Sequence, residues 1–433
     1  MPIMQNAFGI NTLGEQSFQL LENPSRGKGG EQSTHKRQLS RSSLITCGLI
    51  ALLLSGLGLL LGPAPRALAA ANGDIEGYVY VLDNDLSGSN SITTFARAQN
   101  GSLTLLGTTS IGGLGSLSAF ADGTQGSLII THDGKRLFAV DAGSDQISVI
   151  NVKGRQLSPV GTFSSGGTGP VSLTYQNGLL YVLNAANGSS QAGNVAGFHV
   201  DRHGNLHPIP GATQPLSTDH PNPAQVLIDP SGRFLLVTEK QTNLIDVYHI
   251  AKDGSLSALT SYPSTGDYPF GMAFNPASPK QLIVDDGLGG QNNTGAVTSY
   301  HVAHGKVKLI DGPVPDFQIA PCWMIITRDG HYAYTSDADS HTISGYRIHA
   351  DGTISLLNSD GVTGSTPSDT FPLEEGLSHS SRYLYVLDSR LLNSPPGPAT
   401  LSGFLVHHDG SLTTVIDPSQ FTLPFTTIGL AAD

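Results

Sequence analysis

Acidic and amide side chains recur at one position of a repeating pattern. Each short apolar segment that we expect to be a second strand is followed at once by such a residue: Asp83, Asp141, Asn184, Glu239, Asp286, Asp337 and Asp388. Carboxylates gathered on one face could supply a general base, or could hold Ca²⁺ or Mg²⁺ through oxygen ligands. Asp and Asn at strand ends also accept backbone N–H bonds and start turns, so a local structural role is the alternative interpretation.

The acidic residues of this set are assigned to two candidate roles, catalysis and metal binding. Candidate catalytic residues are Glu239, Asp285 and Asp286, since two carboxylates are adjacent there and a third precedes a lysine. Candidate metal ligands are Asp141, Asp337 and Asp388. The cofactor that these residues allow is a divalent cation, Ca²⁺ or Mg²⁺.

A second group of residues is expected near the same face and could bind a substrate. Its members are His220, Asn222, Gln225, Lys240, Phe270, Trp323 and Arg390. Trp323, the only tryptophan, could stack on a sugar or flat ligand, or could be packed between repeats. Its neighbour Cys322 has no His partner in sequence, so we expect a buried, inert thiol.

The elements that must position these residues follow a repeat of about 50 residues. Seven short turns built on glycine are each followed by an apolar residue, and steps of 47 to 58 residues separate their glycines. These glycines are Gly101, Gly154, Gly204, Gly254, Gly305, Gly352 and Gly410. Short strands at this period are typical of a radial array, so the repeat predicts an all-β, seven-bladed β-propeller.

The two ends of the repeat region are predicted to share one blade. Residues 427–432 read as an inner strand without a successor, and the stretch from Gly77 onward reads as a second strand without a predecessor. Pairing them closes the ring and removes its open edges. In the fourth blade we expect strands at 224–228, 233–238 and 244–248, with the outer strand entered at Ser255–Leu256.

The fourth-blade pattern, Asp-Pro-Ser-Gly-Arg-Phe-Leu-Leu-Val at 229–237, resembles the lactonase family of seven-bladed propellers. The stretches at 131–138 and 383–388 are similar to other blades of that family, and the resemblance runs from about Gly77 to the C-terminus. The family includes 6-phosphogluconolactonases and carboxymuconate lactonising enzymes. The resemblance therefore implies lactone opening or a muconate-type cycloisomerisation.

The candidate site departs from the pattern of those enzymes. Where they resemble Pro-His-x-His, this chain has Asn222 and Ala224 in place of the histidines, with only His220 nearby. Where they resemble Gly-Pro-Arg-His, it reads Tyr-Pro-Phe-Gly at 268–271. The carboxylate after the next strand survives only as Asp, in the pair Asp285-Asp286. Lactone chemistry needs a positioned acid–base and donors for an oxyanion, and most of these residue types are replaced.

The first 71 residues are predicted to be a separate leader, and residues 72–433 to be the propeller. Basic Lys36, Arg37 and Arg41 precede an apolar run at 44–61, which prolines and a small-residue stretch follow. This order is typical of a secretory signal, and the run is also long enough for an uncleaved anchor. Both interpretations place the propeller outside the cytoplasm, secreted or held at the cell surface.

The net charge of the chain limits the classes of partner that it could bind. The chain carries a net charge of −12; its first 70 residues hold six Lys/Arg and three Asp/Glu, so the remainder carries −15. This charge excludes nucleic acid and anionic membranes as favoured partners, leaving the N-terminal segment as the membrane contact. We expect a monomer that acts on a small lactone, organic acid or sugar. The alternative is a non-catalytic binding or scaffold propeller for a cation, a glycan or a protein.

Overall fold

The computed structural model describes residues 75–117, 125–186, 191–288 and 294–433. The predicted leader and its apolar run lie outside these residues. Within the described ranges, no helix is long and apolar enough to cross a membrane.

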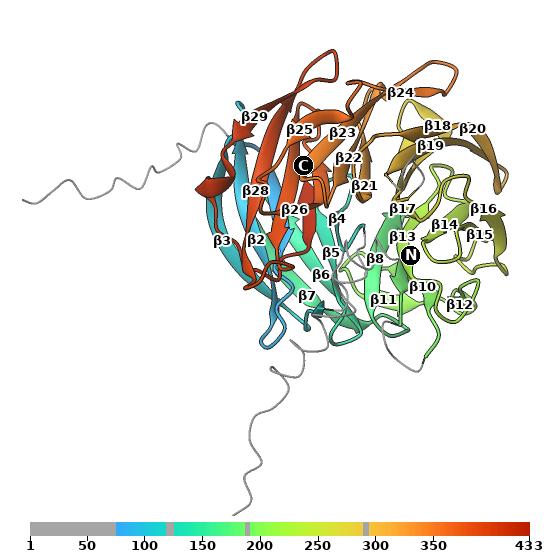
Figure 1. Cartoon of the computed structure of the whole chain (residues 1–433). Helices are drawn as coiled ribbons and strands as arrows, with labels where there is room; N and C mark the ends of the chain where they lie inside the picture. The colour runs from blue at the N-terminus through green and yellow to red at the C-terminus, as the bar shows by residue number, and fades with distance from the viewer. Residues whose placement is uncertain (1–74, 118–124, 187–190, 289–293) are drawn as a thin grey trace, which may run out of the picture. The chain divides into compact units, whose positions relative to one another are not determined.

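Seven antiparallel sheets are arranged around a central channel, with inner strands near the centre and outer strands at the rim (Figure 1). From the channel outward, blade 1 holds β30 (Gly429–Ala432), β1 (Ile75–Leu82), β2 (Asn90–Ala98) and β3 (Leu103–Gly112). Blade 2 holds β4 (Leu128–Ile130), β5 (Arg136–Asp141), β6 (Gln146–Lys153) and β7 (Gln156–Ser164). Blade 3 holds β8 (Pro170–Gln176), β9 (Leu179–Asn184), β10 (Asn194–Val200), β11 (Leu206–Pro208) and β12 (Gln214–Pro215).

The remaining blades repeat this order. Blade 4 holds β13 (Pro223–Ile228), β14 (Phe234–Glu239), β15 (Leu244–His249) and β16 (Thr260–Pro263). Blade 5 holds β17 (Pro269–Asn275), β18 (Ser278–Asp286), β19 (Ala296–Ala303) and β20 (Lys306–Pro315). Blade 6 holds β21 (Pro321–Ile326), β22 (Tyr332–Asp337), β23 (Thr342–Ile348), β24 (Ile354–Leu356) and β25 (Val362–Ser365). Blade 7 holds β26 (Phe371–Leu377), β27 (Tyr383–Arg390), β28 (Gly397–Val406) and β29 (Leu412–Ile416), and a 3₁₀ turn, η2 (Pro418–Gln420), follows it.

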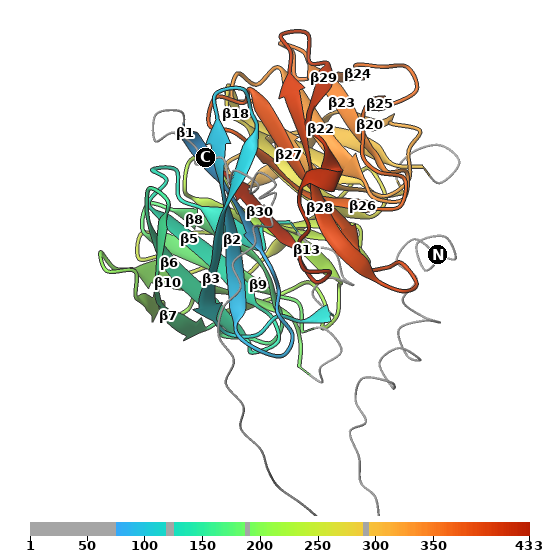
Figure 2. The ribbon, with the colours of Figure 1, turned by 90° about the vertical axis from the view of Figure 1, so that its left-hand side faces the viewer.

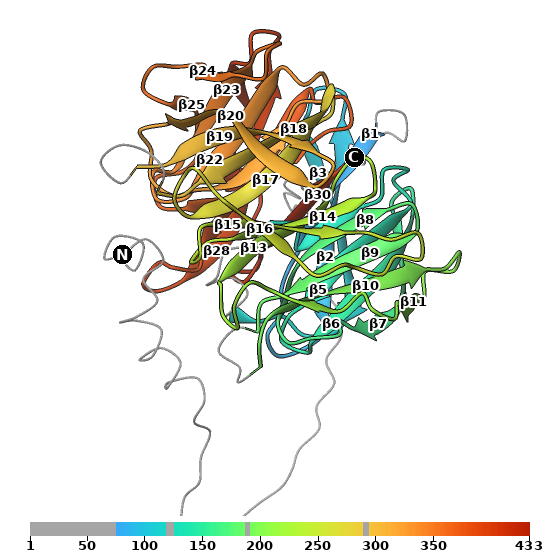
Figure 3. The same ribbon diagram turned by 90° about the vertical axis from the view of Figure 1, so that its right-hand side faces the viewer.

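The ring closes by pairing its first and last strands, as the repeat predicts. β30 lies antiparallel to β1, with Val79 opposite Ala432 and Leu82 opposite Gly429. Figure 2 shows β30, in red, among the blue strands of blade 1, and in Figure 3 the C-terminus lies beside β1. This pairing leaves neither end of the repeat as an open sheet edge.

The seven repeated glycines sit in turns that require them. All seven have a positive φ, between 56° and 95°, a conformation that glycine adopts without strain. Several of these turns also join neighbouring blades. Tyr181 Oη donates to the carbonyl of Gly254 at 2.7 Å, and Tyr385 Oη donates to that of Gly101 at 2.9 Å. The second of these bonds joins blade 7 to blade 1.

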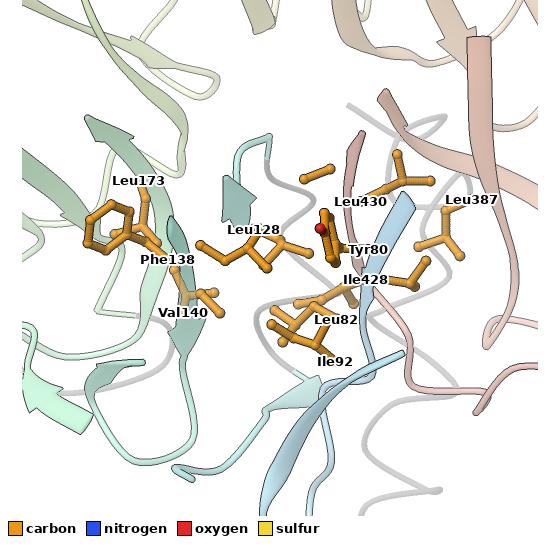
Figure 4. Packing of buried hydrophobic residues seen from close by; sticks show 14 of the residues in the cluster. Tyr80, Leu82, Ile92, Leu128, Phe138, Val140, Leu173, Leu387, Ile428 and Leu430 are labelled. Carbon is orange, nitrogen blue, oxygen red and sulfur yellow. The ribbon is translucent and has the colours of Figure 1, made fainter. Parts of the chain in front are cut away.

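Hydrophobic residues of neighbouring blades interdigitate to form the core. The second strands are apolar on both faces because each blade is covered by a neighbour on either side. Figure 4 shows Tyr80, Leu82 and Leu430 of blade 1 close to Leu128 of blade 2. These side chains belong to one buried cluster, with exposures of 3% or less.

One predicted strand is placed wrongly. The outer strand of blade 4 does not start at Ser255–Leu256, because Leu256 makes only an isolated bridge to Ile250. The regular outer strand, β16, starts at Thr260. Blades 3 and 6 instead split their outer strand into two short pieces, β11 with β12 and β24 with β25.

Candidate functional site

The seven acidic and amide residues at the ends of the second strands are all buried, with exposures of 3% or less. In five blades the carboxylate accepts a hydrogen bond from a Ser or Thr on the third strand, two residues beyond its paired position. The acceptor and donor pairs are Asp83 with Thr93, Asp141 with Ser148, Asp286 with Thr298, Asp337 with Ser344, and Asp388 with Ser402. The blades themselves therefore hold these carboxylates, through side-chain hydroxyls.

Blade 4 departs from this pattern. Glu239 is paired with Leu244, and Asp246 lies two residues further along the third strand, where those five blades have a Ser or Thr hydroxyl. Glu239 instead accepts bonds from the backbone N–H of Ser217 at 2.9 Å and from Thr242 Oγ1 at 2.6 Å. Burial, together with the neighbouring Glu239, raises the pKa of Asp246 to about 7. These bonds hold Glu239 to the connection between blades 3 and 4 and to the turn after its own strand.

Burial also changes the ionisation of the ring carboxyls. Desolvation raises the pKa of Asp141, Asp286 and Asp388 to about 7 in each case, against the stabilising hydroxyl bonds. It raises the pKa of Asp337 well above its usual range. The predicted metal ligands Asp141, Asp337 and Asp388 lie in blades 2, 6 and 7, and the structure does not bring them together. Across the described ranges, no group of three or more His, Cys, Asp or Glu side chains could hold a metal ion.

Four of the predicted site residues do form one cluster, at the end of the channel where the inner strands begin. Lys240 Nζ lies 4.6 Å from the centre of the Phe270 ring, and the Phe270 and Trp323 rings are 5.5 Å apart. The backbone N–H of Gly271 donates to Asp285 Oδ1 at 2.8 Å. The cluster therefore combines a cation, two aromatic rings and a carboxylate from blades 4, 5 and 6.

Cys322 experiences both charges of this cluster. Burial, the largest cause, raises the pKa of the Cys322 thiol well above its usual range. The carboxylate of Asp285 raises this pKa further, and Lys240 lowers it. Cys322 is fully buried. It fits the buried, inert thiol that the sequence predicts.

Asp285 has the environment of a reactive carboxyl. Its Oδ2 atom has no hydrogen-bond partner among the described residues, and the side chain is fully buried. Burial, with Asp286 and Asp316 nearby, raises its pKa well above the usual value. The adjacent Asp286 points to the other side of the strand, because successive side chains of a strand alternate. Its hydroxyl partners are Thr298 and Ser264.

Gln125 belongs to this site, and the sequence analysis missed it. Its side-chain amide makes two hydrogen bonds to the backbone of Met324 on the far side of the ring. Nε2 donates to the carbonyl of Met324 at 2.7 Å, and Oε1 accepts from its N–H at 3.0 Å. A Cβ added to Gly271 would lie 2.3 Å from Gln125 Oε1 and 2.7 Å from Asp285 Oδ2. Gln125 therefore covers Asp285 from the channel side.

Two other predicted ligand-binding residues, Asn222 and Gln225, border the cluster, and the carbonyl of Asn222 accepts a bond from the N–H of Lys240 at 3.1 Å. Asn222 donates to Tyr268 Oη at 3.4 Å, and the Gln225 side chain accepts from the N–H of Met272 at 2.6 Å. His220 is exposed. Arg390 is held by a bidentate contact with Asp369 in blade 7. The side chains of Lys240, Phe270, Asp285 and Trp323 are therefore brought together, with Asn222 and Gln225 beside them, whereas Arg390 lies in blade 7.

Comparison with known proteins confirms the class that the fold defines, a seven-bladed β-propeller. The family described as "Lactonase, 7-bladed beta-propeller" matches residues 127–315, a region that contains most of the cluster. The chain is 24% identical to a 6-phosphogluconolactonase of Cronobacter sakazakii over 237 residues, 52% of this chain. The match spans just under two thirds of that protein, 66% of its length. The lactonase-family resemblance is therefore confirmed.

Solved structures agree on the fold. A protein from Lactobacillus plantarum superposes with a TM-score of 0.64 at 17% identity, covering 83% of this chain and 99% of its own. The periplasmic gluconolactonase of Pseudomonas aeruginosa superposes with a TM-score of 0.60 at 16% identity, covering 82% and 99%. At such identities these similarities establish the architecture, and the chemistry must be argued from this chain's own residues.

Proposed function

We propose that this propeller hydrolyses a small, uncharged lactone, with Asp285 as the general base. The observation that carries the proposal is the buried, unpartnered Oδ2 of Asp285 beside Lys240, Phe270 and Trp323. An acid–base group with a shifted pKa in an apolar environment is characteristic of active sites. The family match covers Lys240, Phe270 and Asp285, and the related proteins named above include lactonases.

The roles in this reaction follow from the chemical groups. Asp285 accepts a proton from water, and the water oxygen adds to the lactone carbonyl carbon. Lys240 supplies positive charge for the oxygen of the tetrahedral intermediate. The ring C–O bond then breaks, and the leaving oxygen takes the proton back from Asp285, giving an open-chain hydroxy acid. The aromatic rings of Phe270 and Trp323 suit the apolar face of a sugar ring.

The proposal requires Gln125 to withdraw, because Asp285 is covered in this structure. It also favours unphosphorylated substrates, since a phosphate beside the carboxyls of Asp285, Asp286 and Asp316 would be repelled in a low-dielectric site. As part of the same proposal we place the activity outside the cytoplasm, because a basic flank precedes the apolar run at 44–61.

The test is hydrolysis by purified protein of a panel of sugar and aliphatic lactones, followed by acid release with a pH indicator. We expect Asp285→Asn to lower kcat/KM by about 100-fold or more, the range that a general base contributes. The rate should rise with pH, because the pKa of Asp285 is raised and only its ionised form accepts a proton.

Asp316→Asn is the matched control. Asp316 is also fully buried, accepts one backbone N–H bond at 2.8 Å from Gln318, and has an unpartnered Oδ2 among the described residues. It acts on the cluster only through its charge, which raises the pKa of Asp285, so hydrolysis should persist in this variant with its pH dependence shifted to lower pH. Equal rates in the wild type and Asp285→Asn would reject the catalytic role of Asp285.

The alternative is a binding or scaffold propeller without catalysis, and one observation favours it. Lys240, Phe270 and Asp285 are each 1% exposed or less, as expected for a packed core and not for an open active site. This alternative predicts no turnover on any lactone of the panel, with or without Ca²⁺. Such a result would replace the enzymatic proposal.

A further inference from the structure

Below the candidate site, the central channel widens into a cavity of about 340 Å³. Much of its wall is aliphatic: Leu128, Ile130, Leu173, Leu227, Ile325 and Leu430. For comparison, a cavity of roughly 150 Å³ is enough to hold a benzene molecule. The channel could therefore hold a compact ligand or a short hydrocarbon chain.

The rest of the lining includes the polar side chains of Gln125, Thr174 and Gln225 and two carboxyl residues, Glu374 and Glu375. Glu374 is fully used by the fold, because it accepts bonds from Gly126 N–H at 2.6 Å, Ser127 Oγ at 2.9 Å and Leu430 N–H at 3.3 Å. Glu375 is only 7% exposed, and neither of its oxygens has a partner among the described residues. A buried carboxyl without a partner is costly to a fold, so its chemistry suggests a ligand.

The surroundings of Glu375 offer no positive charge. Burial, followed by Asp285 in β18, raises its pKa well above the usual value. Its charge in turn raises the pKa values of Asp337 and Tyr334 in β22, and Glu374 precedes it in β26. No Lys, Arg or His is found among the described residues that line the cavity. A cationic group is therefore the complement that this cavity lacks.

We propose that the central channel binds a small aliphatic amine, whose ammonium group pairs with Glu375 and whose hydrocarbon part packs against the leucine and isoleucine wall. Aliphatic walls together with a few placed polar groups are the usual design of a small-molecule site. A metal ion fits less well, because no metal-ligating group of three side chains occurs in the described ranges. This inference does not rest on lactone hydrolysis, since Glu375 is not assigned a step in that reaction.

A second cavity adjoins the first one toward the turns that join the inner and second strands. Its volume is about 420 Å³, and it shares Ile130, Ile325, Leu377 and Ala432 with the first. It is also lined by His132, Arg328, His379 and Asp433, from the turns at the far end of the inner strands. The amine site is thus bordered by Gln125 on the side of the lactone site and by this second cavity at its other end.

The experiment is isothermal titration calorimetry of the protein with hexylammonium, with 1-hexanol and hexanoate as neutral and anionic probes of the same chain length. We expect hexylammonium to bind at least about tenfold more tightly than 1-hexanol, a difference of ~1.4 kcal/mol. Its affinity should increase as the pH rises and Glu375 loses its proton, because burial raises the pKa of that carboxyl. Hexanoate should bind more weakly than either.

Two variants make the test specific. Glu375→Gln should reduce hexylammonium affinity at least about tenfold while leaving 1-hexanol binding unchanged. Leu227→Trp, which fills the cavity from its wall, should abolish binding of both probes and keeps the test usable if the glutamine variant misfolds. Asp316→Asn is the control that removes a buried carboxyl outside the cavity. Absence of hexylammonium binding, or equal affinities in the wild type and Glu375→Gln, would overturn the proposal.

Discussion

At the scale of single residues, the ring of carboxylates has a repeated structural role. Each of five blades holds its acid with a hydroxyl two residues along the neighbouring strand, as with Asp388 and Ser402 at 2.6 Å. The alternative drawn from the sequence is a local role as acceptor of backbone N–H bonds, whereas the donors in these five blades are side-chain hydroxyls. A charge-assisted hydrogen bond of this kind stabilises the ionised form of a carboxyl that burial otherwise disfavours.

This role predicts the effect of Ser402→Ala. The change removes the hydroxyl that donates to Asp388, and Asp388 Oδ1 already has no partner in the described structure. The free energy of unfolding should therefore decrease by about 1–3 kcal/mol. The cost should be larger above the pKa of Asp388, about 7, where the carboxyl is ionised. Urea unfolding at two pH values measures it.

Ser411→Ala provides the comparison for this prediction. Ser411 bonds Asp409 in an exposed turn, so its loss should change the free energy of unfolding by less than ~0.5 kcal/mol. A similar cost for both alanine variants would show that the buried hydroxyl bond has no special role.

The alternation of side chains along a strand explains why the sequence predicts the site only in part. Asp285 and Asp286 are adjacent, and the sequence does not distinguish them as candidates. In the structure they point to opposite sides, so only Asp285 meets Gly271 and the cluster. Gln125 could not be recognised, because its partner Met324 is 199 residues away and is brought near only by closure of the ring.

At the scale of the elements, prediction succeeded where a local signal recurs. The glycine turns and the runs of apolar residues are local properties, and the strands follow them closely. In blade 4 the turn at Gly254 lies where the pattern predicts, but the strand expected after it does not. Leu256 forms only a single bridge, and β16 begins at Thr260. The glycine pattern fixes where the chain turns, while regular pairing after the turn depends on longer-range contacts.

The same turns carry bonds between blades, which gives a prediction for Tyr385→Phe. Removing its hydroxyl leaves the carbonyl of Gly101 without its partner from blade 7, at the junction where the ring closes. We expect a loss of about 1–2 kcal/mol in the free energy of unfolding, measured by chemical denaturation.

Tyr80→Phe is the matched control for that change. Tyr80 is equally buried, but its Oη has no hydrogen-bond partner among the described residues. Its removal should be neutral or stabilising, because a buried unpaired polar atom is lost. If Tyr385→Phe were as well tolerated as Tyr80→Phe, the turn carbonyls would not be important contacts between blades.

At the scale of the whole molecule, the propeller concentrates buried carboxyls in and around its channel. Burial raises the pKa of Asp141, Asp286 and Asp388 to about 7 and that of Glu374 to about 8. The ring architecture explains this concentration, because it brings equivalent strand ends from every blade to the same depth. Acids that would be exposed in a single sheet are here covered by the next blade.

These shifts predict that the protein is more stable in mildly acidic solution than in alkaline solution. A carboxyl whose pKa is raised in the folded state binds more protons folded than unfolded between its two pKa values, here from about 4 to about 8. Stability therefore decreases as pH rises through that range, by up to ~1.4 kcal/mol per pH unit for each such group. Melting temperatures at fixed ionic strength should be several degrees higher near pH 5 than near pH 8. Asp388→Asn, which removes one of these groups, should make the decrease less steep; a melting temperature that rises with pH would show that these carboxyls are ionised in the folded protein.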